Sequence, residues 1–373
     1  GKGSYGIGAP AVPYQEDKLT YLRITDINDD GSLNFSDLKS VDAEDAEKYI
    51  LKENDIVFAR TGNSTGRSYF YEKQHGTFVY AGFLIKFSLD PHKVNPRILK
   101  YYTHSKPYFD WVNSFDTGGT RGNINAKTYG DMEIELPSRK VQDNIVSILS
   151  SLDRKIELNN KINAELEEMA QAIFKNWFVD FEPFKDGKFV ESELGIIPEG
   201  WKVGCLGELC KFKRGKNLLT KNAIDEGIPV VAGGLEPSCF HNVANTGAPV
   251  VTVSGSGANA GFMKMYHVPV WASDCSFIDI SCENFYFVYC FLKVNSKLLK
   301  HAQTGAVQPH VKPSDIHDFE LIIPDKKSII EFQDKVKPFY DRIAATQKES
   351  SRLSALRDTL LPRLMSGEIS IPD

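Results

Sequence analysis

The sequence DMEIELP occupies residues 131–137, and the related sequence DFELIIP occupies residues 318–324. The two stretches lie 187 positions apart. The same offset relates a Thr-Gly pair at residues 117–118 to one at residues 304–305, and it continues through the apolar positions that follow. A repeat of this length contains a complete structural unit. The sequence therefore predicts a duplicated protein in which a globular part and a helix occur twice.

A long amphipathic helix is expected after each copy of this stretch. In residues 141–178, apolar residues recur at alternating intervals of four and three, which is the heptad pattern of a coiled coil. The second helix is expected from about residue 328 to residue 365. Pro338 should start or kink it, because proline removes a backbone donor and clashes with the preceding turn.

Polar residues interrupt each heptad pattern at its midpoint. They are Asn159 and Asn163 in the first helix, and Thr346 and Ser350 in the second. If the helices pack antiparallel about a pseudo-two-fold axis, their midpoints meet. We then expect these four residues to form a polar layer that fixes the register of the helices. The alternative is a pair of separate surface helices that share only ancestry.

Composition narrows the functional class. The chain has 373 residues and a net charge of -5, which as a bulk property is mildly unfavourable for nucleic-acid binding. No apolar run approaches the ~18 residues of a membrane span, and no signal peptide is visible. The first residue is Gly, so we expect that the natural N-terminus is incomplete. All six cysteines lie after residue 204 without a Cys-x-x-Cys pair, which indicates reduced thiols in a cytosolic protein.

The segments before each helix predict mixed α/β globules. Strand-like apolar stretches occur at residues 56–59 and 83–87, and again at 249–253 and 277–280. Helical patterns follow them. The glycine-rich stretch after residue 254 has no helix behind it to bind a dinucleotide, and no P-loop sequence is present. The residues therefore favour a protein without a catalytic site, a metal site or a cofactor.

Several motifs resemble those of a known family. They are PEGW at residues 198–201, LGEL at 206–209, RGK at 214–216, LP at 136–137 with Gln142, Ile145, Leu149 and Asp153, and LLPRLMSGEI at 360–369. In this order, and repeated, they resemble the specificity subunits of type I restriction-modification systems over essentially the whole chain. Two departures stand out. The first copy lacks PEGW and begins at Lys2-Gly3-Ser4 as the equivalent of Arg214-Gly215-Lys216, and the second copy lacks a glutamine that matches Gln142.

The resemblance implies an architecture and a set of partners. The fold would be two similar α/β target-recognition globules, joined by two long helices packed as an antiparallel coiled coil. The expected domains are 1–140, the first target-recognition domain; 141–190, a conserved helix and linker; 191–326, the second target-recognition domain; and 327–373, the C-terminal conserved helix. The subunit would be cytoplasmic and non-catalytic, and would bind a bipartite site in double-stranded DNA. It would assemble with methyltransferase subunits and a restriction motor subunit, which would bind S-adenosylmethionine and ATP with Mg²⁺.

Three polar loops in each copy are candidates for DNA contact, because Arg, Lys, amide and hydroxyl side chains bind phosphates and base edges. In the first copy the candidates are Lys2, Ser4 and Tyr5; Arg60, Thr61, Asn63, Ser64 and Arg67; and Arg121, Asn123 and Asn125. In the second copy they are Lys213, Arg214 and Lys216; Ser254, Ser256 and Asn259; and Gln308, His310 and Lys312. We pair residues 60–67 with residues 254–261. A single loop of this kind is more typical of a solvated turn, but equivalent loops with different side chains favour two readers of different half-sites.

Two other functional classes stay open from the residues alone. One is a helix-linked scaffold that binds protein partners without DNA contact, which the negative net charge slightly favours. The other is a stand-alone nuclease or methyltransferase, for which the sequence offers no motif.

Overall fold

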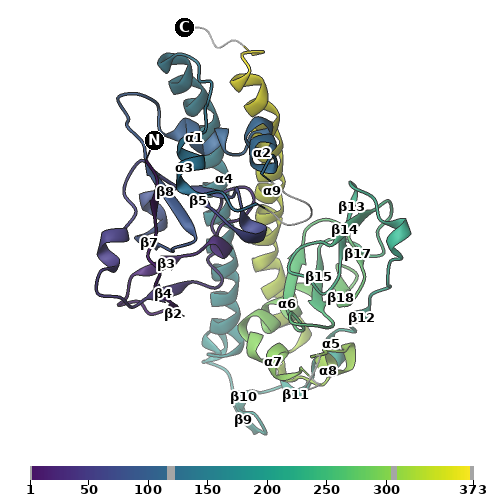
Figure 1. Ribbon diagram of the computed structural model, residues 1–373. Helices are drawn as coiled ribbons and strands as arrows, with labels where there is room; N and C mark the ends of the chain where they lie inside the picture. Colours follow the sequence, from purple (N-terminus) through teal and green to yellow (C-terminus); the bar gives the residue numbers. More distant parts are fainter. Residues whose placement is uncertain (1, 116–121, 304–308, 370–373) are drawn as a thin grey trace. The chain divides into compact units, whose positions relative to one another are not determined.

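The computed structural model describes residues 2–115, 122–303 and 309–369 (Figure 1). The chain forms two compact units, Gly1–Glu157 with Ser350–Asp373, and Leu158–Glu349. We call them unit 1 and unit 2. Each contains one globular part and a portion of each long helix, so the boundary between the units falls within the helices. The four domains expected from the sequence stay a prediction, because the two units are defined by contacts in space and not by segments of the sequence.

Unit 1 contains two four-stranded sheets. The first has the strand order β1-β8-β5-β6 and is antiparallel, and the second has the order β2-β4-β3-β7, in which β3 and β7 are parallel. The strands are β1 (Ser4–Tyr5), β2 (Ala11–Pro13), β3 (Thr20–Leu22), β4 (Lys39–Val41), β5 (Asp55–Ala59), β6 (Ser68–Phe70), β7 (Phe78–Tyr80) and β8 (Leu84–Ser88). The helices are α1 (Arg97–Tyr102), α2 (Lys106–Asn113) and α3 (Ala126–Gly130), with short 3-10 turns η1 (Ile24–Asp26), η2 (Ala46–Tyr49), η3 (Gly62–Ser64) and η4 (Lys73–His75).

Strand β5 is buried on both faces, and this explains its continuous apolar sequence. Side chains alternate across a strand. Ile56 and Phe58 therefore pack with helices α1, α2 and α3, while Val57 and Ala59 pack with strands of the second sheet. Because β5 is held on both faces, the position of the next residue, Arg60, at the start of the polar loop is also fixed.

Unit 2 repeats the first sheet of unit 1. Its strand order β12-β18-β15-β16 corresponds to β1-β8-β5-β6, with the same antiparallel pairing. The strands of unit 2 are β9 (Phe189–Ser192), β10 (Gly195–Pro198), β11 (Lys202–Cys205), β12 (Lys213–Arg214), β13 (Ile228–Val231), β14 (Cys239–His241), β15 (Val250–Ser254), β16 (Met263–Tyr266), β17 (Trp271–Ala272), β18 (Cys275–Asp279) and β19 (Glu320–Ile323). Its short helices are α5 (Leu206–Leu209), α6 (Phe285–Val294), α7 (Ser296–His301) and α8 (Pro313–His317), with η5 (Glu182–Phe184) and η6 (Thr220–Asn222).

The two long helices are α4 (Arg139–Phe178) and α9 (Lys326–Met365), each of 40 residues (Figure 1). Within each unit their segments run antiparallel. In unit 2 the ring of Phe332 lies 5.1 Å from that of Phe178, and Asn159 bonds to Glu349. Pro338 does not start the second helix, which begins at Lys326. Phe332, before the proline, and Tyr340, after it, are both buried, and this packing offsets the lost backbone hydrogen bond.

Three of the four predicted polar-layer residues lie together in unit 2. Asn159 is fully buried, and its Nδ2 donates to the carbonyl oxygen of Thr346 at 3.5 Å and to Oε2 of Glu349 at 2.8 Å. Thr346 Oγ1 donates to Oδ1 of Asn163. Ser350 belongs to unit 1. Glu349 was not predicted, since a charged residue beside a heptad seam is normally expected to face the solvent.

Matched positions on the two helices have different chemistry. Asp153 in unit 1 is buried and accepts hydrogen bonds from Tyr101 Oη at 3.0 Å and from Arg357 at 3.1 Å, with Lys100 Nζ also 3.1 Å away. Burial acts to raise the pKa of Asp153, but Lys100 and Arg357 outweigh it and hold that pKa below its ordinary value. The Asp153 carboxylate is therefore a charged anchor between helix α4 and the rest of unit 1.

The position equivalent to Asp153, 187 residues later, is Tyr340. Tyr340 is buried in unit 2 and stacks on Tyr286, with ring centroids 5.1 Å apart. Its hydroxyl lies 3.2 Å from the Cys290 sulfur. An aromatic cluster thus takes the place of the ionic one.

A glutamine caps the same point of each unit, although the sequence motif finds it only once. Gln142 Oε1 accepts from the backbone N of Asn95 at 3.0 Å, before helix α1. In unit 2, Gln333 Oε1 accepts from the backbone N of Tyr286 at 3.0 Å, in the first turn of helix α6. Gln333 lies one helical turn after the position that matches Gln142 at the offset of 187, so the repeat in the sequence does not reveal it.

All six cysteines are free thiols. In the described part of the chain, no helix combines the length and the apolar character that a membrane crossing requires.

Candidate nucleic-acid interface

The polar loops after strands β5 and β15 have the same backbone hydrogen bonds. Gly66 N donates to Ala59 O at 3.1 Å, and Gly261 N donates to Ser254 O at 2.9 Å. This pairs Ala59 with Ser254, so the predicted pairing of residue 60 with residue 254 is wrong by one position. The correct register matches Gly62 with Gly257 and the positive-φ Gly66 with Gly261. Aligning glycine with glycine would have found it from the sequence.

The opening segments also pair differently from the prediction. Gly6 N donates to Leu84 O at 3.1 Å on strand β8, and Gly215 N donates to Cys275 O at 2.8 Å on strand β18. Tyr5-Gly6-Ile7, and not Lys2-Gly3-Ser4, is therefore the equivalent of Arg214-Gly215-Lys216. A Cβ on Gly6 would lie 2.3 Å from backbone oxygens, and one on Gly215 would lie 2.1 Å from Ser273 O. Both positions require glycine because another part of the backbone lies against them.

The third loop joins the second in the same way in both units. The backbone N of Ile124 donates to Arg60 O at 3.0 Å, and that of Val311 donates to Gly255 O at 3.1 Å. Both donors belong to buried residues that anchor the loop. Here the predicted offset of 187 is correct. Three segments that are distant in sequence thus meet on one backbone frame in each unit.

We call the side chains on these frames tip 1 and tip 2. The residue before strand β8 also belongs to tip 1, because Arg60 N donates to Phe83 O at 3.1 Å, and Gly255 N donates to Asp274 O at the same distance in unit 2. Tip 1 consists of Tyr5, Arg60, Thr61, Phe83 and Asn123, and tip 2 of their equivalents Arg214, Gly255, Ser256, Asp274 and His310.

Tip 1 is built from aromatic side chains and one arginine. The Arg60 guanidinium carbon lies 5.1 Å from the centre of the Tyr5 ring, which is a cation–π arrangement. The Tyr5 hydroxyl accepts from the backbone N of Ala126 at 3.1 Å, which fixes the ring. Phe83 is 58% exposed.

Tip 2 is built around an ion pair. Arg214 donates to Oδ1 of Asp274, and the Ser256 hydroxyl donates to Oδ2 of the same carboxylate. A Cβ on Gly255 would lie 2.2 Å from a terminal nitrogen of Arg214, so the guanidinium lies against the bare glycine backbone. The arginine of tip 2 therefore comes from the position that holds Tyr5 in tip 1, and the glycine occupies the position of Arg60.

Other predicted residues are either exposed or bound within the fold. Lys2, Lys213, Lys216, Lys312, Asn63 and Asn123 are exposed. Arg67 donates to Asp29 at 2.7 Å, Asn259 donates to Gly233 O at 3.3 Å, and Asn125 Oδ1 accepts from Thr128 N as the cap of helix α3. Four more make internal contacts: the Ser4 hydroxyl with Tyr80, Ser64 with Arg67, Ser254 with Gly233, and His310 in a backbone bridge with Ser256. Arg121 and Gln308, like residues 117–118 and 304–305, lie outside the described residues.

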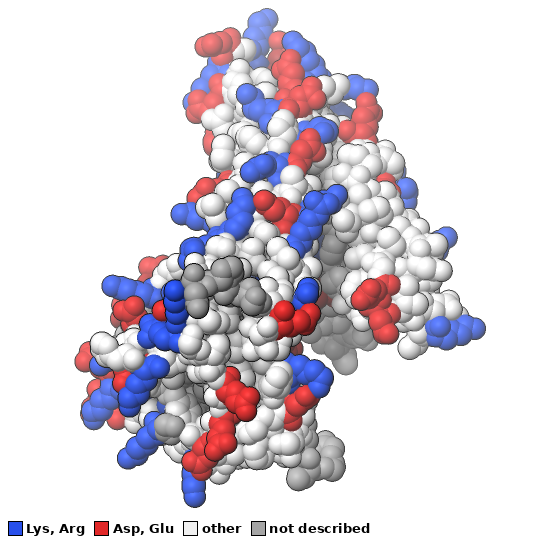
Figure 2. Space-filling model, turned by 90° about the horizontal axis from the view of Figure 1, so that it is seen from above, with Lys and Arg blue, Asp and Glu red and all other residues white. Residues whose placement is uncertain are grey.

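Phe83 and Asp274 were missed by the sequence reasoning. Each stands directly before a buried strand and reaches its tip only through pairing with a loop that is distant in sequence. On the face drawn in Figure 2, Lys and Arg side chains are interspersed with Asp and Glu side chains, so the negative net charge does not prevent cations from being available locally.

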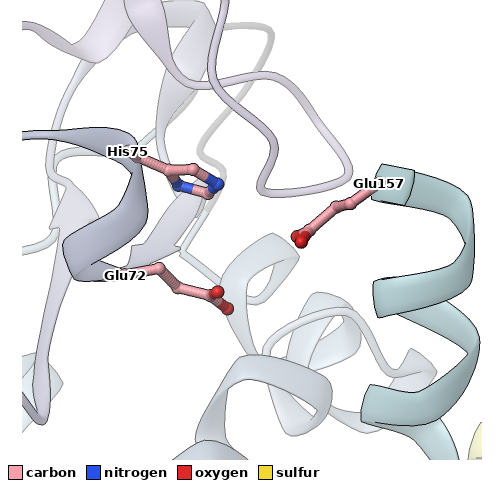
Figure 3. Close-up of side chains that lie close together, drawn as sticks. All are labelled: Glu72, His75 and Glu157. Carbon is pink, nitrogen blue, oxygen red and sulfur yellow. The ribbon is translucent and has the colours of Figure 1, made fainter. Parts of the chain in front are cut away.

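Glu72, His75 and Glu157 form a separate group in unit 1, in which the side chains point toward one another (Figure 3). Their ligand atoms lie within 4.8 Å of one another. Gln74 Nε2 donates to both carboxylates, at 3.1 and 2.9 Å, and Lys100 lies 3.0 Å from Glu72. Because these donors already balance the carboxylates, we do not assign a metal to this group.

Comparison with known proteins agrees with the repeat. Residues 13–168 and 198–354 match the family model of the type I restriction modification DNA specificity domain. The chain is 31% identical over 299 residues to the type I restriction enzyme MjaIX specificity subunit of Methanocaldococcus jannaschii, covering 74% of this chain and 69% of that one. It is 24% identical over 413 aligned residues to the HindI specificity subunit of Haemophilus influenzae, covering 86% and 88%.

The fold is similar to the crystal structure of the type I restriction-modification S subunit from M. genitalium. The TM-score is 0.55 at 20% identity, and the match covers 100% of this chain and 93% of that chain. One family match falls in each copy of the repeat, and together they span most of the sequence. The chain therefore belongs to the family of type I restriction-modification specificity subunits, as a non-catalytic subunit whose two repeated recognition domains give DNA sequence specificity.

Proposed function

We propose that each unit binds one half of a bipartite site in double-stranded DNA through its tip. The observation that supports this most is the contrast between frame and side chains: three converging segments keep the same backbone bonds in both units, while the residues that they present differ. A duplicated scaffold with different tips is what reading two different half-sites requires.

Exposed lysines beside the tips would supply the affinity for the phosphate backbone. Lys2 precedes Tyr5 of tip 1 by three residues, and Lys213, Lys216 and Lys312 stand within two residues of Arg214 or His310 of tip 2. Cations that neutralise phosphates release counterions, so this part of the binding weakens as salt rises. Arg214 and the amide side chains at the tips would contact base edges in the major groove, whereas Arg60 would contact a phosphate.

The long helices would set the distance between the two half-sites and dock the methyltransferase subunits. Each helix contributes residues to both units. In this assembly a restriction motor subunit also joins, and the partners bind S-adenosylmethionine and ATP with Mg²⁺ while this chain binds no cofactor. The complex would act in the cytoplasm, where its DNA substrate is.

Two units that read the same face of B-DNA would sit about one helical turn, 10–10.5 bp, apart, which leaves an unread gap of roughly half a turn or a little more. Inserting one heptad into both α4 and α9 should lengthen this gap in the methylated motif. An unchanged gap would refute the role of the helices as a spacer.

The alternative is a scaffold that binds only protein partners. The complex of this chain with its methyltransferase subunits should bind one split DNA sequence with an affinity that falls steeply between low and physiological salt. Binding to the protein partner alone, without preference for any split sequence, would support the scaffold instead.

A further inference from the structure

We propose that Asp274 is a positioning residue that aligns Arg214 to read a guanine in the half-site of unit 2. This inference rests on the proposed DNA binding and names the base class that tip 2 selects. It also assigns a role to the residue that directly precedes strand β18.

Asp274 is held at both carboxylate oxygens, by Arg214 at one and by Ser256 at the other. Gly255 removes the side chain that would otherwise occupy the space of the guanidinium. Arg214 is thus confined by a carboxylate and by a bare stretch of backbone, and its side chain remains 45% exposed. A guanidinium has five N–H donors, so the hydrogen bond to Asp274 leaves others for a base.

An arginine that binds phosphate works through its positive charge, and a carboxylate partner would cancel much of that charge. The N7 and O6 atoms of guanine are neutral acceptors that require a planar fork in a fixed orientation. A carboxylate that fixes the fork is therefore compatible with reading guanine and unfavourable for binding phosphate.

Tip 1 lacks this carboxylate. There the equivalent of Asp274 is Phe83, and the arginine rests on the Tyr5 ring. Among the described residues, no carboxylate forms an ion pair with Arg60. Tip 1 has an arginine without the orienting partner, so the guanine preference assigned to Arg214 should be absent from the equivalent contact of unit 1.

The test is base preference, measured with the chain in complex with its methyltransferase subunits. The methylated motif of the wild-type complex is mapped first. Methylation is then measured on a DNA library that carries every base at every position of that motif. The variants are Arg214→Lys, which keeps the charge but loses the fork, and Asp274→Ala, which keeps Arg214 but frees it. Glu236→Gln is the matched control, because it removes one carboxylate from the Lys264 ion pair of the same unit.

Both tip variants should lose preference for one guanine by about 5- to 100-fold, as expected for a bidentate contact. Preference at all positions of the other half-site should be unchanged, which also shows that the variants fold. Glu236→Gln should keep the wild-type preference.

Unchanged preference in Arg214→Lys would overturn guanine reading, and relaxation in Arg214→Lys without relaxation in Asp274→Ala would overturn positioning by Asp274. A uniform rise in affinity for Asp274→Ala at unchanged preference would also contradict it, since that is the effect of removing a negative charge. The proposed function fails separately, if the wild-type complex shows no preference for any split sequence.

Discussion

Unit 1 and unit 2 differ in the side-chain contacts of their helices and tips, but they share the backbone hydrogen bonds of their loops. At the helix, a charged Asp153 in unit 1 corresponds to an aromatic Tyr340 in unit 2. At the tips, the arginine comes from the loop after β5 in unit 1 and from the opening segment in unit 2. The bonds made by Gly6 and Gly215, by contrast, are the same. A frame held by backbone hydrogen bonds allows its side chains to diverge, and this gives one fold two reading surfaces.

The largest expected difference between the units concerns their anchors on the helices. Asp153→Asn leaves the partly buried Arg357 with only the exposed Asp358 as a charge partner, and Lys100 with only Glu72. We therefore expect unit 1 to lose about 3 kcal/mol, the lower end of the cost of breaking a buried ion pair. Tyr340→Phe removes only a neutral contact and should cost unit 2 about 1 kcal/mol. Hydrogen exchange, followed separately in each unit through a urea titration, measures both. Equal losses would show that the ionic anchor is not special.

The same pair predicts a pH dependence. Because the pKa of folded Asp153 is lowered, its stabilising effect is complete above the unfolded pKa of about 3.9 and is lost as pH falls through the folded pKa. The stability difference between wild type and Asp153→Asn should therefore shrink below about pH 4. For Tyr340→Phe the difference should stay constant over this range. A wild-type advantage over Asp153→Asn that is as large at pH 2 as at pH 7 would contradict the assignment.

A smaller loss of stability should be equal in the two units, because Gly6 and Gly215 occupy equivalent positions in the shared backbone frame. Gly6→Ala and Gly215→Ala each force a Cβ against a backbone oxygen, which should cost about 1–3 kcal/mol in either unit. Gly8→Ala is the control, since a Cβ there meets nothing within 4 Å. Thermal unfolding of the three variants measures this. A loss in only one unit would mean that the frames are not equivalent.

The smallest expected effect separates the two arginines. Arg60 has no carboxylate partner among the described residues, so its full charge is available to a phosphate. Arg60→Ala should reduce the salt dependence of DNA binding by about one ion, whereas Arg214→Ala should leave the slope nearly unchanged. Affinity titrations of the complex at several salt concentrations provide both slopes. The reverse order would assign the phosphate contact to Arg214.

The sequence predicted the parts of this molecule that follow a period. The heptads of α4 and α9 and the offset of 187 are regular, so the repeat, the antiparallel helices and the meeting of Asn159 with Thr346 could be anticipated. The registers of the opening segment and of the loop after β5 could not, because short glycine-rich segments carry no apolar period. Asp274 and Phe83 were invisible for a related reason: pairing between distant segments brings them to the tips.

If two different readers share one frame, exchanging one tip loop should change what one reader recognises and leave the other as it is. Residues 60–66 are replaced by residues 255–261, which have the same length and the same closing bonds. The methylated motif is then mapped across the genome of cells that carry the altered chain with its methyltransferase subunits. We expect a change in one half of the motif, with the other half and the gap unchanged. A motif that is unaltered, or altered in both halves, would contradict it.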